Sequence, residues 1–288
     1  MYAMRRVLLL AMALSTASHG VDLQGHRGAR GLAPENTLPG FMQALAIGVS
    51  TLELDTGVTR DGVVVIHHDR SLNPDIARGP DGKWIEPPGP AIAELAFAEL
   101  QRYDVGRIRP GSEYARRFAH QKPVDGARIP RLSDLFAKAS GSVRFNIETK
   151  IAPEAPAEPF ARALIAELRR ARVEPRTTIQ SFDWRTLKVV EREAPEIATS
   201  YLTGAKDSEP AKVHAAGGRI WSPDFQALSA QRLAAARALR LKVIAWTVNE
   251  PADIARALDM KLDGIISDYP DRVRAEMRAR GLPLPASL

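Results

Sequence analysis

Two short stretches of the sequence carry residue types that could do chemistry together. The first, Gly25–Asp69, includes His26, Arg27, Glu53, Asp55 and His68. The second, FNIETK at 145–150, adds an acid and a base: Glu148 and Lys150. Acids that hold a hard cation, imidazoles that move protons and cations that bind phosphate oxygens are typical of a metal-assisted site that cleaves a phosphodiester.

The first pair of acids lies in an alternating segment. In LELD at Leu52–Asp55, Glu53 and Asp55 would share one face of a strand and the leucines the other. A solvated edge strand would give the same alternation. The strands of a parallel barrel, however, are buried on both faces, where carboxylates are costly unless they are paired or bind a metal.

The alternation recurs in the second stretch. Asn146, Glu148 and Lys150 would share one face, and Phe145 and Ile147 the opposite face. Three acids in two such strands indicate a built site with all-oxygen ligation, which selects a hard cation. We therefore expect Mg²⁺ or Ca²⁺. The expected ligands are Glu53, Asp55 and Glu148, and Lys150 would point at phosphate oxygens.

The histidines lie where strands are expected to end. His26 and Arg27 follow the first such segment, and His68 follows VVVIH. Strand ends carry the chemistry of barrels, so two histidines there suit an acid–base pair, and Arg27 can bind phosphate with two parallel hydrogen bonds. Between His67 and His68 we favour His68, because the adjacent Asp69 could orient it; His67, at opposite parity, is expected to pack.

Composition narrows the possible functions. The chain has 288 residues, 45% hydrophobic and 26% charged, with a net charge of +6, which suits a globular protein with a sizeable core. Lysines and arginines are scattered, so nucleic acid is not an expected partner. The chain has no cysteine, which excludes disulfides, zinc–thiolate sites and cysteine nucleophiles.

The first twenty residues have the order of a signal peptide. Arg5 and Arg6 precede an apolar run at 7–14, and small residues follow at 15–18. A buried N-terminal helix is the alternative. The apolar run is short for a bilayer span, so no stable membrane insertion is expected. We predict a signal peptide at residues 1–20 and a periplasmic or secreted protein.

Beyond residue 20, strand-like and helical segments alternate. This predicts an α/β protein with a parallel sheet, and the number of units favours a closed (β/α)₈ TIM barrel. The expected strands are Val21–Gln24, Leu52–Val58, Val63–His67, Val143–Glu148, Thr177–Ser181, Ile197–Leu202, Arg219–Ser222, Val243–Val248 and Gly264–Ser267. Nine candidates compete for eight places. The link between the second and third is too short for a parallel crossover, which leaves a hairpin or a sharply bent extension.

Residues from about 70 to 131 interrupt this rhythm. They are rich in proline, glycine and charge, and they are too long for an ordinary barrel loop. The aromatic residues Trp84, Phe97, Tyr103 and Tyr114 favour a small folded insertion over a disordered one. The expected domain organisation is thus one barrel domain over 21–288 with an inserted subdomain.

Read together, these motifs resemble the glycerophosphodiester phosphodiesterase family. The resemblance rests on HRG at 26–28, PENT at 34–37, ELD at 53–55, T-x-D-G-x-x-V-x-x-H-D at 59–69 and NIETK at 146–150. The segments QSF at 180–182, WTVN at 246–249 and DGIISDYP at 263–270 are also similar. Thr56 and Thr149 replace residues that are usually aliphatic, on the face opposite the proposed ligands.

The resemblance implies a TIM barrel with a small insertion and a divalent metal in its mouth. It implies that His26 and His68 are the acid–base pair, that Glu53, Asp55 and Glu148 hold the metal, and that Arg27 and Lys150 bind phosphate. It also places Glu35 near the site and Trp246 in the pocket lining, although Trp246 could equally be a core aromatic.

The expected activity is metal-dependent hydrolysis of glycerophosphodiesters, small-molecule substrates, to sn-glycerol 3-phosphate and an alcohol. The resemblance implies attack by the glycerol 2-hydroxyl through a cyclic phosphate; direct attack by water stays open, as do the order of the two histidines and the oligomeric state. The alternative is a lysophospholipase D or phospholipase C-like enzyme of related architecture. A non-catalytic phosphate-binding barrel is less favoured, and an unrelated barrel isomerase least.

Overall fold

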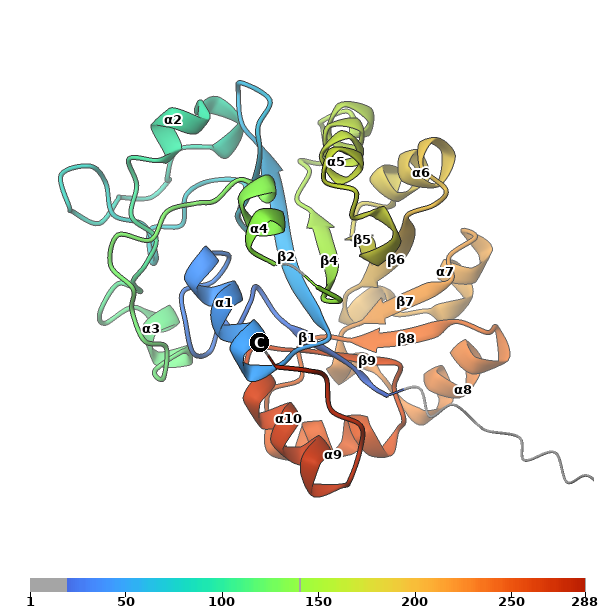
Figure 1. The fold of residues 1–288 in the computed structure, drawn as a ribbon. Helices are drawn as coiled ribbons and strands as arrows, with labels where there is room; N and C mark the ends of the chain where they lie inside the picture. Colours follow the sequence, from blue (N-terminus) through green and yellow to red (C-terminus); the bar gives the residue numbers. More distant parts are fainter. Residues whose placement is uncertain (1–19, 140, 288) are drawn as a thin grey trace, which may run out of the picture.

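Eight parallel strands close into a barrel in the computed structural model, which describes residues 20–139 and 141–287 (Figure 1). The strands run β1, β9, β8, β7, β6, β5, β4, β2 around the sheet, and β1 also pairs with β2. This closure confirms the predicted (β/α)₈ TIM barrel. The bounds are β1 Asp22–Gly25, β2 Thr51–Val58, β4 Arg144–Thr149, β5 Thr177–Ser181, β6 Ala198–Thr203, β7 Ile220–Pro223, β8 Lys242–Ala245 and β9 Gly264–Ser267.

The ninth expected strand is not a barrel strand. β3 (Val64–Ile66) runs antiparallel to the end of β2, with Thr56 opposite Ile66 and Val58 opposite Val64. The short Thr59–Gly62 link therefore makes a hairpin, and the bent-extension alternative is wrong. The sheet therefore has eight barrel strands and one additional strand, β3, which pairs with the end of β2 that extends beyond the barrel rim.

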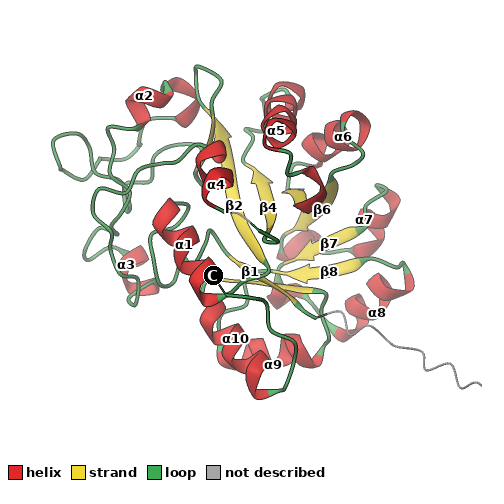
Figure 2. Cartoon of the chain, in the orientation of Figure 1, coloured by secondary structure: helices red, strands yellow, loops and turns green. Residues whose placement is uncertain are grey.

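Helices cover the outside of the barrel in the described part of the chain (Figure 2). They are α1 Leu38–Ile47, α4 Leu132–Lys138, α5 Ala157–Ala171, α6 Trp184–Glu193, α7 Pro210–Ala215, α8 Ala230–Ala238, α9 Pro251–Asp259 and α10 Pro270–Ala279. Their ends follow local sequence signals. Gly48 ends α1 with a φ of 89°, Ser229 caps α8 by accepting from the backbone N–H of Arg232, and Pro251 opens α9.

The long segment between β3 and α4 forms a lobe beside the barrel (Figure 1). It contains α2 (Phe97–Leu100), α3 (Glu113–Arg117) and the 3₁₀ turn η1 (Ile92–Glu94). The other 3₁₀ turns are η2 Glu174–Arg176, η3 Ala205–Asp207 and η4 Phe225–Ala227. The lobe has a hydrophobic cluster separate from the main core: Val65, Leu72, Ala77, Ile92, Leu100, Val105 and Ile129. A cluster of this kind is what lets the segment adopt a defined fold.

Burial along β2 follows its alternation. Leu52 and Leu54 belong to the main hydrophobic core, whereas Glu53 and Asp55 are equally buried on the other face. Within residues 20–139 and 141–287, no helix is both long and apolar enough to cross a bilayer. The predicted signal peptide lies, apart from Gly20, outside the described residues.

Candidate active site

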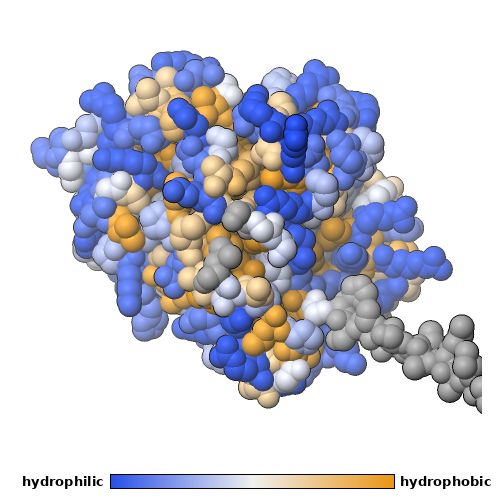
Figure 3. Space-filling view, in the orientation of Figure 1, coloured by the Kyte–Doolittle hydropathy of each residue, from blue (hydrophilic) through white to orange (hydrophobic). Residues whose placement is uncertain are grey.

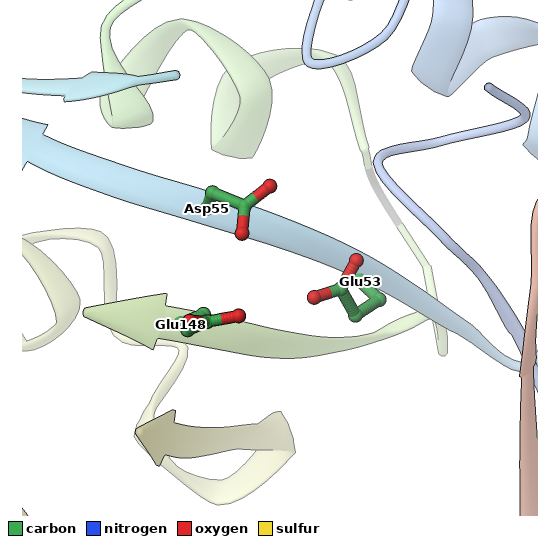
Figure 4. Close-up of side chains that lie close together, drawn as sticks. All are labelled: Glu53, Asp55 and Glu148. Carbon is green, nitrogen blue, oxygen red and sulfur yellow. The ribbon is translucent and has the colours of Figure 1, made fainter. Parts of the chain in front are cut away.

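Three carboxylates meet inside the barrel mouth. Glu53 and Asp55 come from β2 and Glu148 from the neighbouring β4, where Asp55 and Glu148 are register partners. One oxygen of each lies within 4.8 Å of the others, and all three side chains are buried. Figure 4 shows the three carboxylates pointing toward a common space. The strand register therefore brings together acids that lie more than ninety positions apart in the sequence.

The electrostatics of this triad call for a cation. Burial and the neighbouring carboxylates Asp55 and Glu148 raise the pKa of Glu53 well above its usual range. Burial also raises the pKa of Glu148, with repulsion from Asp55 adding to it. Asp55 Oδ1 is buried without a hydrogen bond, although Lys150 Nζ lies 3.2 Å away. An all-oxygen set with an unsatisfied buried acceptor fits a hard divalent cation.

The loop after β1 positions two of these acids. The backbone N–H of Arg27 donates to Glu53 Oε2 at 2.9 Å, and Asn36 Nδ2 donates to Asp55 Oδ2 at 2.9 Å. Arg27 and Asn36 both have φ near 50°, so the loop is tightly curved. Gly28 continues this curvature with a φ of 88°, and a Cβ there would lie 2.7 Å from the Gly40 backbone. The HRG and PENT motifs are thus two sides of one loop.

Arg27 and Glu35 form a buried ion pair in that loop. Arg27 Nη1 donates to Glu35 Oε1 at 2.8 Å, and Arg27 Nε lies 3.2 Å from Asp55 Oδ2. The Tyr114 hydroxyl, from the insertion, donates to the other oxygen of Glu35. Although burial opposes ionisation, Arg27 and Arg30 lower the pKa of Glu35. Glu35 therefore stands behind Arg27 and orients it.

His26 is held by an acid from the last strand. Its Nδ1 lies 2.7 Å from Asp268 Oδ1, and its Nε2 lies 3.8 Å from Glu53 Oε2. Arg30 binds both oxygens of Asp268, at 2.7 and 2.9 Å. Despite burial, Arg30 and His26 hold the pKa of Asp268 well below its usual range, so Asp268 can only accept and His26 Nδ1 must carry the proton. Burial and Arg30 lower the pKa of His26 to about 4.

His68 has an equivalent partner at the mouth. Its Nδ1 lies 2.7 Å from Asp69 Oδ1, and Asn73 donates to Asp69 Oδ2 at 3.0 Å. Burial raises the pKa of Asp69, but the hydrogen bond from His68 and electrostatic attraction to the neighbouring imidazoles outweigh burial and lower that pKa to about 2. His67 is buried elsewhere, with Nε2 3.3 Å from the Ser71 carbonyl. The structure thus places His68, and not His67, at the site.

One cavity of about 190 Å³ unites these groups. Its lining contains His26, Arg27, Arg30, Glu53, His68, Arg117, Glu148, Lys150, Gln180, Phe182, Leu202, Trp246, Thr247 and Ile266. Trp246 therefore lines the cavity, where it packs edge-to-face on Phe182 with 5.4 Å between ring centroids. Of the residues predicted at the site, Asp55 and Glu35 lie behind this lining.

Several residues that hold the site together were not predicted from the sequence. Asp268 orients His26, Gln180 donates to Glu53 Oε1 at 2.7 Å, and Asn36 orients Asp55. All three belong to motifs named above: Asp268 to DGIISDYP, Gln180 to QSF and Asn36 to PENT. The signal for Asp268 was an acid directly after the last expected strand, where barrel chemistry is found.

A family model matches the site and nearly all of the barrel. The model describes the glycerophosphoryl diester phosphodiesterase family and matches residues 26–272. This chain belongs to that family. A glycerophosphodiester phosphodiesterase of Bacillus subtilis (strain 168) is 28% identical over 261 residues, covering 85% of this chain and 83% of the relative.

Solved structures of glycerophosphoryl diester phosphodiesterases are also similar to this chain. A structure from Silicibacter pomeroyi DSS-3 that carries the family's name is 38% identical with a TM-score of 0.88, covering 92% of this chain and 95% of that one. An Oleispira antarctica phosphodiesterase, in complex with the product sn-glycerol-3-phosphate, is 25% identical with a TM-score of 0.73, covering 91% and 98%. These relatives span this chain almost completely.

Proposed function

We propose that this protein hydrolyses glycerophosphodiesters to sn-glycerol 3-phosphate and an alcohol, with Mg²⁺ or Ca²⁺ as cofactor. The observation that carries the proposal is that two acid-oriented histidines line the same cavity as Glu53 and Glu148. Membership of the glycerophosphoryl diester phosphodiesterase family and the product named for the Oleispira structure support the substrate class.

Glu53, Asp55 and Glu148 would hold the cation. When bound, such a cation neutralises phosphate charge and eases deprotonation of a coordinated hydroxyl. Lys150 donates to Glu148 Oε1 at 2.6 Å, yet an ammonium has three N–H donors. Lys150 and Arg27 both line the cavity and keep donors that can turn to phosphate oxygens.

We assign the role of general base to His26. Its lowered pKa keeps it neutral near pH 7, and the Asp268 hydrogen bond fixes the proton on Nδ1. The lone pair on Nε2 then faces the cavity and can take the proton of the attacking hydroxyl. His68, oriented by Asp69 at the partly exposed mouth, would protonate the leaving alkoxide. Both steps need no displacement of the two aspartates.

A turnover panel tests the proposal. Glycerophosphocholine and related diesters should be hydrolysed with Mg²⁺ or Ca²⁺ and not in excess chelator. His26→Ala and His68→Ala should each lower kcat by roughly 10²–10⁴, while His214→Ala, an exposed histidine on α7, should not. Full turnover in chelator, or wild-type rates in either variant, would contradict the assigned chemistry.

An apolar groove favours lysophospholipids as a second substrate class. A hollow of about 1020 Å³ shares Lys150 with the catalytic cavity. Its walls are largely apolar and include Ile92, Ile151 and Phe160. Figure 3 shows hydrophobic surface in the notch between the insertion lobe and α5. Turnover of lysophosphatidylcholine that rises with acyl length, beside glycerophosphocholine, would support this activity; no turnover would exclude it.

We also propose export to the periplasm or medium. The charged, apolar and small-residue order of residues 1–20 supports it. Mass spectrometry of protein recovered from the periplasm or medium should show a mature N-terminus near residue 20. An intact Met1 on exported protein would contradict cleavage.

A further inference from the structure

We propose that Arg117 recognises an anionic group on the leaving alcohol, so that diesters whose alcohol carries a phosphate or carboxylate are preferred. This inference rests on the proposed function and adds to it a specificity-determining residue from the insertion. Arg117 lies on α3 and belongs to none of the sequence motifs that carry the family resemblance.

The insertion is docked so that α3 overlooks the catalytic cavity. Tyr114 donates to Glu35, and Phe118 packs under Arg30 with the guanidinium 4.6 Å from the ring centroid. Just beyond the helix, Gln121 Nε2 donates to the Arg30 carbonyl at 2.8 Å. These contacts tie both sides of α3 to the loop after β1, and they place Arg117 in the lining of the cavity.

The other cations of the cavity each form an ion pair with a carboxylate of the protein. Arg27 is bound to Glu35, Arg30 to Asp268, and Lys150 to Glu148. Arg117 is exposed, and among residues 20–139 and 141–287 it has no ion-pair or hydrogen-bond partner for its side chain. Its guanidinium lies 5.4 Å from the Phe118 ring centroid. Its five N–H donors are therefore available to a ligand.

A second hollow continues outward from this arginine. It has a volume of about 430 Å³ and shares Arg117 and Thr247 with the catalytic cavity. Its basic lining residues are Arg116, Arg117, His120 and Arg272, and its acidic ones are Glu250 and Asp253. Asp253 is already bound, by Gln226 at 3.0 Å and Arg256 at 3.3 Å.

An anion is favoured where this hollow meets the catalytic cavity, because Arg117 lines both and its positive charge has no carboxylate partner. The glycerol end of a substrate belongs beside the acid triad, where the hydroxyl must be deprotonated. The alcohol on the other side of the phosphate can then extend along Arg117. A phosphate or carboxylate there would form charge-assisted hydrogen bonds with the guanidinium, with two-point geometry available.

The test uses two diesters that differ only in this charge. Glycerophosphoglycerol and glycerophosphoglycerol 3-phosphate are compared, with glycerophosphocholine as a cationic third substrate. Arg117→Ala should lower kcat/KM for the phosphate-bearing diester by roughly five- to fiftyfold, mainly through KM. The other two substrates should change less than about threefold, because they make no charge-assisted bond to this residue. Arg117→Lys should restore part of the preference.

Arg102→Ala is the matched control. It removes the same charge from an exposed site of the insertion that does not line the cavity, so it should leave the ratio of the substrates unchanged. The loss in Arg117→Ala should also shrink at high salt. Equal loss on all three diesters, or an unchanged ratio, would overturn the proposal.

A binding measurement separates this proposal from the proposed function. Titration of glycerophosphoglycerol 3-phosphate in chelator, followed by calorimetry, should show weaker binding to Arg117→Ala than to the Arg102→Ala control. Binding that depends on Arg117 without turnover in Mg²⁺ or Ca²⁺ would contradict hydrolysis alone. Turnover of all diesters without any such dependence would contradict only the role of Arg117.

Discussion

His26 and Asp268 lie 242 positions apart and are joined by a 2.7 Å hydrogen bond from Nδ1 to Oδ1. The two residues follow β1 and β9, which are neighbours only because the barrel closes. Asp268 in turn is bound by Arg30 and by Asn249 Nδ2 at 2.7 Å. The tautomer of His26 is therefore fixed from the opposite end of the chain.

Asp268→Asn should lower kcat by roughly 10²–10⁴, because an amide can donate to His26 and favour the wrong tautomer. The carboxylates of the acid triad do not contact Asp268, so cation affinity measured by calorimetry should change little. The variant also leaves Arg30 buried without its counter-charge, which should cost about 3–5 kcal/mol in urea unfolding. Wild-type kcat in a folded variant would remove Asp268 from the mechanism.

Glu53→Gln should stabilise the cation-free protein and abolish stabilisation by the cation. The substitution removes one of three carboxylates whose mutual repulsion raises the pKa of Glu53. In wild type, a cation at a hundred times its Kd should add about 2.7 kcal/mol to the free energy of unfolding. Thermal unfolding with chelator and with Ca²⁺ measures both effects. A variant that is still stabilised by Ca²⁺ would contradict the assigned ligand set.

Asn36→Gly should weaken cation binding by roughly 10–100-fold, the usual effect of losing a residue that orients a ligand. Asn36 donates to Asp55 Oδ2 and accepts from the Asp55 backbone N–H at 3.3 Å. Glycine tolerates the φ of 52° at this position, so the loop itself should persist. Asn36→Ala is the control for backbone strain, because alanine does not tolerate this φ. Compared with Asn36→Gly, it should lose more free energy of unfolding but little more cation affinity.

The His26 ring should titrate near pH 4 in chelated protein, followed by NMR of its Cε1 proton. An unfolded chain takes up this proton near pH 6.5, whereas the folded protein does not until about pH 4. Stability linked to His26 is therefore lost as pH falls from 6.5 toward 4, by up to about 1.4 kcal/mol per pH unit. His26→Gln should remove that slope. A native ring that titrates near 6.5 would contradict the burial argument.

The barrel and the residue types of the site could be predicted because both depend on patterns within short sequence segments. Leu52–Asp55 alternates with the period of a strand, and Phe145–Lys150 repeats the device. In parallel strands that are buried on both faces, such acids must converge inside the barrel. Even the choice of His68 over His67 followed from parity and from the adjacent Asp69.

The pairing of those residues could not be predicted in the same way. The link at 59–62 permits a hairpin or a bent extension, and only the packing of β3 against β2 and the insertion decides between them. Arg27 appeared in the sequence as a phosphate-binding residue, yet its side chain is also committed to Glu35 and Asp55. Tyr114 donates to Glu35 from the inserted lobe, whose sequence shows no strand or helix periodicity that would predict this contact.

The sequence by itself determined which functional groups the protein carries and which strand ends present them. The reason is that successive side chains point to opposite faces of any strand, whatever it packs against. Tertiary structure decided which groups meet. Closure of β1 onto β9 brings Asp268 to His26, and the docking of α3 brings Arg117 to the cavity. These contacts depend on strand register and on the packing of remote segments, which no local pattern encodes.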